Sequence, residues 1–170
     1  MASALSSEVR AVQNPALGAM LLWRCSVGYS ATHELANPAP LPLLYLVFPI
    51  MFHKETAAQV TSTNKASGLR KFSENFQAPG GQSKTDLLLA IGPRARAMRR
   101  LSSASLGLAV LGNLIHVEEE TGRAIAVSLT PATSGIPVSV RPLLAGAEKL
   151  GAWFSQLSLY ETALLLQVSL

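Results

Sequence analysis

The sequence predicts a mostly helical α+β protein, in which a winged-helix-like unit of one helix and a β-hairpin is flanked by additional N- and C-terminal helices. Apolar residues make up 49% of the chain, which is enough to bury a sizeable core and argues against disorder. They recur at helical spacing on both sides of the middle of the chain. Between these parts, residues 102–128 read as a short apolar helix followed by two strands around a loop that contains Gly122.

A chain of 170 residues fits a single domain. We expect three parts within residues 1–170: a helical N-terminal part at 14–76, the winged-helix-like part at 83–129, and C-terminal helices at 139–168.

The first helix is expected over residues 14–29. Asn14 is a good N-cap, Pro15 suits the first helical position, and Gly28 can end the helix. Residues 36–42 hold three prolines and read as an extended, rigid linker.

The next helix is expected over residues 42–60. It is apolar nearly all round as far as Phe52, which indicates burial on several sides. Pro49 lacks an amide hydrogen and should kink it. The most apolar run, residues 41–52, is twelve residues long and falls short of the roughly 20 that cross a bilayer. No membrane partner is therefore expected.

A third helix is expected over residues 65–76, because Leu69, Phe72 and Phe76 lie three and four residues apart. Residues 77–83 read as a loop, because they are rich in glycine and polar residues.

The winged-helix-like part follows this loop. Gly92 and Pro93 should interrupt its first helical turns, and Pro93 can open a new helix. The apolar helix after it should end at Gly112 as a C′ glycine. Strands are expected at residues 114–117 and 123–129.

Two helices should close the chain. The first, over residues 139–156, is amphipathic. The second, over residues 158–168, begins with a capping box of Ser158 and Glu161.

Charged residues make up only 14% of the chain, against roughly 25% in an ordinary soluble domain. A surface so poor in charge leaves apolar area exposed, and exposed apolar patches mark partner sites. The positive charge is concentrated in residues 54–100, with nine Lys or Arg against three Asp or Glu. Such a basic middle suits nucleic acid or an acidic partner, and a solvated face is the simpler alternative.

The sharpest charged feature is a run of four arginines without an acid. Its members, Arg94, Arg96, Arg99 and Arg100, are candidate nucleic-acid contacts, because the planar fork of arginine binds phosphate bidentately. On one helix the last three would share a face at spacings of three and four. The alternatives are a solvated face or pairing with the acids at 118–120.

Base readout by the winged-helix-like unit is not expected. A recognition helix needs hydrogen-bond donors that reach base edges, but residues 103–112 offer serines and otherwise Leu, Ala, Val and Gly. Three consecutive acids at the hairpin tip would repel phosphate. The apolar helix therefore favours a protein partner or the protein's own core. Any DNA contact would come from the arginines and be independent of sequence.

The sequence offers no catalytic constellation, nucleotide-binding loop or paired cysteines. The histidines His33, His53 and His116 are far apart and are most simply structural. The one cysteine, Cys25, sits in an apolar run, fits a buried position, and suits a reducing cytoplasm. We expect a protein that is not an enzyme, with no metal or cofactor, in the cytoplasm.

Four stretches, taken in order, carry a family resemblance: NPALGAMLLWRCSVGY, LPLLYLVFPIMFH, RARAMRR and LGLAVLGNLIHVEEETGRAIAV, before a closing amphipathic helix. Over about residues 14–168 the chain resembles the middle components of bacterial three-component ABC ATPase systems. The resemblance implies a non-catalytic bridge to an SMC/Rad50-like coiled-coil ATPase and an effector, for which a nuclease is one candidate. It also implies a role in anti-phage or anti-plasmid systems, including Lamassu-like ones, with DNA sensed mainly through the complex.

Aromatic residues are enriched at interface hot spots, which suggests where such a scaffold would dock. The candidate docking residues form two groups, Tyr45, Phe48 and Phe52, and Trp153, Phe154 and Leu157. The alternative is that all of them belong to the core. The rival function is a free, sequence-independent DNA-binding protein or regulator that uses residues 94–100.

Overall fold

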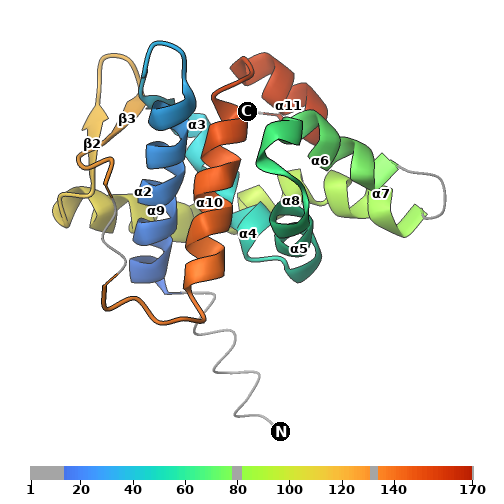
Figure 1. Ribbon diagram of the computed structural model, residues 1–170, viewed down its shortest axis with the longest axis horizontal. Coiled ribbons are helices and arrows are strands. Elements are labelled where there is room, and N and C mark those ends of the chain that lie inside the picture. The colour runs from blue at the N-terminus through green and yellow to red at the C-terminus, as the bar shows by residue number, and fades with distance from the viewer. Residues whose placement is uncertain (1–13, 78–81, 131–133, 170) are drawn as a thin grey trace, which may run out of the picture.

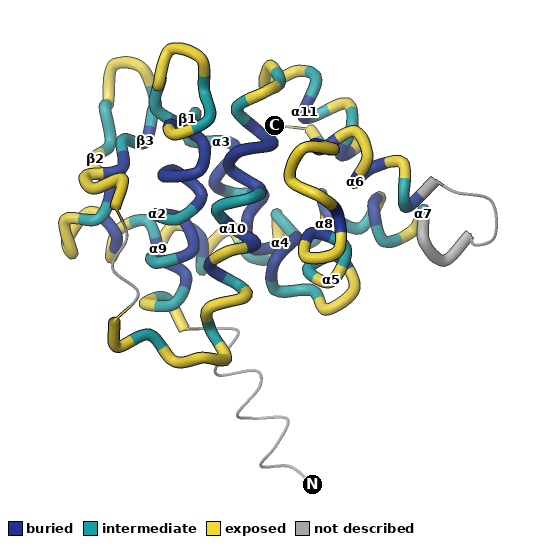
Figure 2. The backbone as a smooth tube through the Cα atoms, in the orientation of Figure 1, coloured by how far each residue is buried: buried dark blue, intermediate teal, exposed yellow. Residues whose placement is uncertain are grey.

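The structure is a computed structural model that describes residues 14–77, 82–130 and 134–169. It is mostly helical with one small antiparallel sheet, as the sequence predicts. Helices α2 and α10 lie side by side at the centre (Figure 1), and Figure 2 shows both buried over most of their length. The helices are α2 Pro15–Thr32, α3 Leu41–Leu44, α4 Val47–Met51, α5 Lys54–Ser62, η1 Lys65–Ser67, α6 Gly68–Gln77, α7 Gln82–Leu89, α8 Ile91–Ala97, α9 Arg99–Leu111, α10 Arg141–Phe154 and α11 Leu159–Leu166. The strands are β1 Ala39–Pro40, β2 Ile115–Glu118 and β3 Arg123–Ala126.

Helix α2 begins where predicted and extends further than expected. The side chain of Asn14 accepts a hydrogen bond from the amide of Ala16 at 2.9 Å, and Pro15 is the first helical residue. The prediction that Gly28 ends the helix is wrong. Gly28 is buried inside α2, which continues to Thr32.

Gly28 lies at the contact between α2 and α10, where a glycine from each helix lets the two backbones touch. A Cβ added at Gly28 would overlap the carbonyl oxygen of Glu148. A Cβ added at Gly151 would overlap the carbonyl oxygen of Cys25. Both glycines are therefore packing residues.

Residues 42–60, predicted as one kinked helix, form three short helices instead. Pro49 is the third residue of α4 and has no amide hydrogen to donate to the carbonyl of Tyr45, so α3 cannot continue into α4. The amides of Tyr45 and Leu46 bond instead to carbonyls three residues back. The predicted burial is confirmed, because every residue of α4 is buried.

The third predicted helix is present as the 3₁₀ turn η1 followed by α6. Leu69, Phe72 and Phe76 are all buried, as the spacing predicts. The ring of Phe72 lies 5.9 Å from that of Trp153, centroid to centroid, so α6 packs directly on α10.

The helix break predicted at Gly92 and Pro93 lies two residues earlier, at Ala90, between α7 and α8. Pro93 is in the first turn of α8, where its missing amide hydrogen costs little. A second break, which the sequence does not predict, falls at Met98, and α9 begins at Arg99.

The predicted hairpin is confirmed as β2 and β3, and it follows α9 directly. The helix ends at Gly112 as expected, but Gly112 has a φ of −79°, and the left-handed residue is Asn113 with a φ of 54°. Strand β1, which the sequence does not predict, lies in the predicted linker and pairs with β3 through Ala39 and Ala124. The sheet order is β1-β3-β2. The likeness of this unit to a winged helix stays an interpretation.

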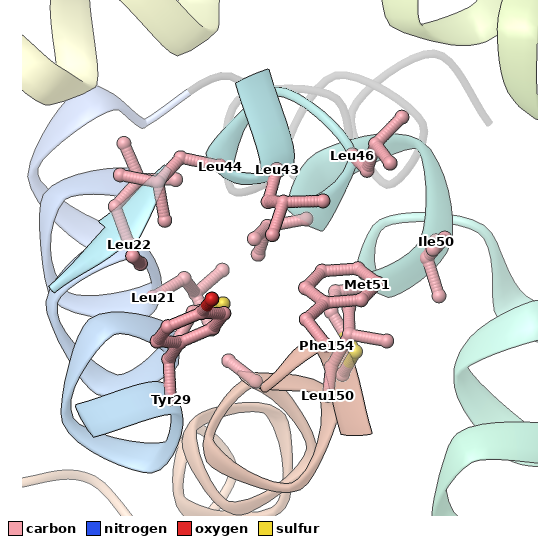
Figure 3. Close-up of a cluster of buried hydrophobic side chains, with 14 of the residues drawn as sticks. Leu21, Leu22, Tyr29, Leu43, Leu44, Leu46, Ile50, Met51, Leu150 and Phe154 are labelled. Atoms are coloured by element: carbon pink, nitrogen blue, oxygen red, sulfur yellow. The ribbon is translucent and has the colours of Figure 1, made fainter. Parts of the chain in front are cut away.

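The two closing helices are α10 and α11. The capping box is confirmed, because the amide of Ser158 donates to Glu161 Oε2 at 2.9 Å and the amide of Glu161 donates to Ser158 Oγ at 3.1 Å. One hydrophobic cluster gathers side chains from Ala19 on α2 to Leu166 on α11, and Figure 3 shows its centre. Among the described helices, none has the length and apolar character that a membrane span requires.

Candidate partner-binding surfaces

The arginine run is divided between two helices by the break at Met98. Arg94 and Arg96 belong to α8, whereas Arg99 and Arg100 are the first two residues of α9. The expectation that the run occupies one helix is therefore wrong.

Arg94 is built into the fold. Its guanidinium donates to the carbonyl oxygens of Pro49 at 2.7 Å, Leu87 at 2.7 Å and Ala90 at 3.1 Å. The carbonyls of Pro49 and Leu87 lie in the last turns of α4 and α7, where a helix leaves carbonyls unpaired and favours a positive charge. The carbonyl of Ala90, the N-cap of α8, also accepts from the backbone amide of Arg94 at 3.0 Å. Burial lowers the pKa of Arg94, and the nearby Glu55 partly opposes this. With its donors used internally, Arg94 is a poor candidate for nucleic-acid contact.

The other three arginines face solvent. Arg96, Arg99 and Arg100 are exposed. In the part of the chain that the structure describes, no ion pair joins any of them to an acid, including the acids at 118–120. Arg99 and Arg100 also lie at the N-terminal turn of α9, where the helix dipole adds positive potential. These three arginines therefore form a basic surface open to an anionic partner.

Three of the predicted docking residues are core residues instead. Phe48, Trp153 and Phe154 are each 0% exposed. The indole nitrogen of Trp153 donates to the carbonyl oxygen of Lys65 at 2.8 Å. Figure 3 shows Phe154 inside the hydrophobic cluster, beside Met51. For these residues the core alternative holds, because contact with a partner would require the core to open.

The remaining docking candidates, Tyr45, Phe52 and Leu157, are half-buried. Phe52 packs on Phe48 with ring centroids 4.9 Å apart. The hydroxyl of Tyr45 is 3.1 Å from Ser103 Oγ on α9, which is hydrogen-bonding distance. Tyr45 is thus the docking candidate that lies closest to the basic surface.

A groove of about 490 Å³ runs beside Tyr45, and we call it the Tyr45 groove. It is lined by Leu41, Pro42, Tyr45, Leu46, Gly92, Ala95, Arg96, Arg99, Val168 and Ser169. Its walls are mainly apolar, with two of the exposed arginines at its edge. The chemistry of this groove suits a partner that is both apolar and acidic.

The outer face of α9 is apolar and exposed to solvent. The sequence alone left open whether this helix packs in the core or against a partner. We call Arg100, Ala104, Gly107 and Leu111 the α9 seam, because they lie four, three and four residues apart and all are exposed. Leu111 is 83% exposed, and the neighbouring Leu108 is 42% exposed. A Cβ added at Gly107 would meet nothing within 4 Å. The opposite face of α9, which includes Ala109, packs on α2.

The outer face of α11 is a second uncovered apolar surface. Tyr160 is 76% exposed and Leu164 is 65% exposed. They line a groove of about 650 Å³ that also includes Val168 and Ser169. Because Val168 and Ser169 line the Tyr45 groove as well, the two grooves together extend from α11 to Arg99, the first residue of α9. The C-terminal end of α9 lies apart from α11, with α11 at the upper right and the C-terminal end of α9 at the left edge of Figure 1.

Titratable groups elsewhere in the described part of the chain do not converge on a metal site, since no three His, Cys, Asp or Glu side chains come together there. Burial raises the pKa of the Cys25 thiol to about 12. The pKa of His53 is lowered, first by burial and then by the charge of Arg94, with Glu55 opposing.

Comparison with known proteins identifies the family of this chain. A family model described as "ABC-three component (ABC-3C) system Middle Component 3" matches residues 2–170. No curated protein matches, and no solved structure matches. The description names a middle component, which is a subunit other than the ATPase.

Proposed function

Because the chain belongs to the Middle Component 3 family of ABC-three component systems, we propose that it is a non-catalytic adaptor that joins the ABC ATPase to an effector component. In this proposal the ATPase is a coiled-coil enzyme of the SMC/Rad50 type. The effector, for which a nuclease is one candidate, binds a separate part of this chain. DNA is sensed mainly through the assembled complex.

The observation that carries the proposal is the pair of uncovered apolar surfaces, one on α9 and one on α11. They expose large side chains such as Leu111 and Tyr160 to solvent. Exposed apolar patches on a protein surface mark protein–protein contacts. Because the two surfaces lie on different helices and apart in space, two partners can bind at the same time.

Reconstitution of the complex tests whether this chain joins the ATPase to the effector. The chain is co-expressed with the ABC ATPase and the third component of its own system, and the complexes are separated by size with and without nuclease. We expect one nuclease-resistant complex of all three proteins, which falls apart into unlinked ATPase and effector when this chain is left out. A stable ATPase–effector complex without the chain would overturn the bridging role.

A role in defence against phage or plasmids extends the proposal and rests on the family resemblance, which includes Lamassu-like systems. A strain that carries the complete system should restrict an incoming phage or plasmid, and deletion of this chain should remove the restriction. Restriction that persists after the deletion would contradict the extension.

A second candidate function, sequence-independent DNA binding, is favoured by the three exposed arginines. It predicts that the isolated chain binds duplex DNA with an affinity that falls steeply with salt. Substitution of Arg96, Arg99 and Arg100 by glutamate should then abolish DNA binding, whereas under the adaptor proposal the variant still binds the component that contacts α11. Fluorescence anisotropy with a labelled duplex separates these outcomes.

A further inference from the structure

We propose that the α9 seam receives a single amphipathic α-helix from one of the other components, with acidic residues where that helix passes Arg99 and Arg100. This inference rests on the adaptor function proposed above and names the chemistry of one of its two partners.

The spacing of the seam identifies a helix as the occupant. Exposed residues at intervals of four, three and four form the narrow line along which two helices pack in a coiled coil. The seam rises over about 16 Å, so it accommodates roughly three turns of a partner helix. A strand or an irregular loop would not follow this line.

The middle of the seam is built from small residues. Ala104 and Gly107 supply almost no side chain, and the space above Gly107 is open. A partner helix can therefore approach closely there and insert a large apolar side chain. Leu111, which is 83% exposed, closes the far end of the seam, and Leu108 flanks it. Removal of this apolar area from water favours binding.

The positive charge at the N-terminal end of the α9 seam indicates an acidic partner. Arg99 and Arg100 have no acidic partner among the described residues, and they stand where the α9 dipole adds positive potential. A carboxylate on the partner helix would pair with these arginines and would be stabilised by the positive potential at the start of α9. Arg96 and the Tyr45 groove continue this apolar and basic surface beyond the seam. A partner segment that places an acidic residue beside the arginines can therefore place an apolar residue in the groove.

A second copy of this chain fits the seam less well. An antiparallel pair of seams would place Arg100 against Leu111, and a parallel pair would place Arg100 against Arg100. No acidic residue lies between Asp86 and Glu118, so α9 of a second copy supplies no carboxylate. Duplex DNA fits less well too, because phosphate would satisfy the arginines but leave Leu108 and Leu111 uncovered.

Two seam variants and a matched control test the inference in binding assays with the purified ABC ATPase and, separately, the purified third component. Leu111→Asp places a charge on the seam, and Gly107→Leu fills its gap. Both positions are exposed, so the fold should tolerate both changes, and thermal unfolding verifies this. Leu35→Asp makes the same apolar-to-acid change in the turn after α2, at a residue that is 77% exposed and lies outside both proposed binding surfaces.

We expect each seam variant to weaken the Kd for the same one component by about tenfold or more, while Leu35→Asp leaves that Kd unchanged. Arg99→Glu with Arg100→Glu should weaken it as well and reduce its dependence on salt. If the wild-type chain binds the components but both seam variants bind like wild type, the inference is wrong and the adaptor proposal stands. If the wild-type chain binds neither component, the adaptor proposal itself is wrong.

A crosslink identifies the occupant. Cys25 is the only cysteine and is buried, with its pKa raised to about 12, so a thiol-reactive photo-crosslinker labels Leu111→Cys selectively. In the reconstituted complex the crosslinked peptide should come from one of the other components and combine helical apolar spacing with acidic residues. A peptide of this same chain, a non-helical segment, or crosslinked DNA would overturn the inference.

Discussion

Arg94 differs from the three arginines near it because backbone carbonyls surround it. Three carbonyl oxygens, from Pro49, Leu87 and Ala90, receive its N–H groups. Their positions depend on where α4 and α7 end and on how α8 packs against them. The sequence shows four similar arginines, and only the fold distinguishes the internal one from Arg96, Arg99 and Arg100.

Arg94→Ala should therefore lower the free energy of unfolding by about 3 kcal/mol, because three carbonyl oxygens in a partly buried site lose a charge-assisted hydrogen-bond donor. Arg94→Lys should recover only part of this loss, since one ammonium cannot reproduce the fork that spans two helix ends. Arg96→Ala is the matched control on the same helix and should change stability by less than about 0.5 kcal/mol. Urea unfolding of the three variants measures the differences. Equal losses for Arg94→Ala and Arg96→Ala would contradict the assignment.

His53 gives stability a dependence on pH. Burial and the charge of Arg94 lower its pKa in the folded state, and Glu55 opposes them. The unfolded chain therefore takes up a proton first as the pH falls, so the free energy of unfolding should decrease below about pH 6.5 and level off below the folded-state pKa. His53→Gln should remove this component, as measured by urea unfolding between about pH 7.5 and pH 5. An unchanged pH profile in the variant would show that other groups are responsible.

At the scale of elements, the contact of α2 with α10 depends on Gly28 and Gly151, each of which lies against the backbone of the other helix. A Cβ at either glycine would meet a carbonyl oxygen, that of Glu148 or Cys25, and a backbone atom cannot move aside as a flexible side chain can. The exposed Gly107 on α9 is the opposite case, with open space where a Cβ would stand. One substitution should therefore have opposite effects at these positions.

Gly28→Ala and Gly151→Ala should each destabilise the protein by about 1–3 kcal/mol, because α2 and α10 are forced apart. Gly107→Ala should instead stabilise it by about 0.5–1 kcal/mol, because alanine lowers the entropic cost of forming the helix. Thermal unfolding of the three variants provides the measurement. A stabilising Gly28→Ala would mean that the two helices do not touch at this point.

The elements with strong local signals were predictable. Asn14 and Pro15 mark the start of α2, Ser158 and Glu161 mark the start of α11, and the strands flank a loop containing Gly122. The elements that depend on distant residues were not. Strand β1 is two residues long and exists because β3 lies beside it, so its proline-rich sequence gave no strand pattern.

At the scale of the whole molecule, apolar composition predicts that partner surfaces exist but does not place them. Trp153 and Phe154 have the residue types of interface hot spots, yet they form the core. Leu111 and Leu164 look like ordinary helix residues, yet they face solvent. Core and interface are built from the same apolar side chains, so only the packing of α2, α6 and α10 around each other reveals which residues remain uncovered.

The two uncovered apolar surfaces, on α9 and on α11, lead to a prediction about the complete assembly. If α9 and α11 contact different partners, Leu111→Asp should weaken binding to one component and Leu164→Asp should weaken binding to the other. The double variant should then show losses that add within about 0.5 kcal/mol for each partner, because the sites share no contact. Binding of the variants to each purified component, measured by calorimetry, provides the values. If both substitutions weaken the same interaction, the two surfaces bind one partner, and the chain does not bridge two.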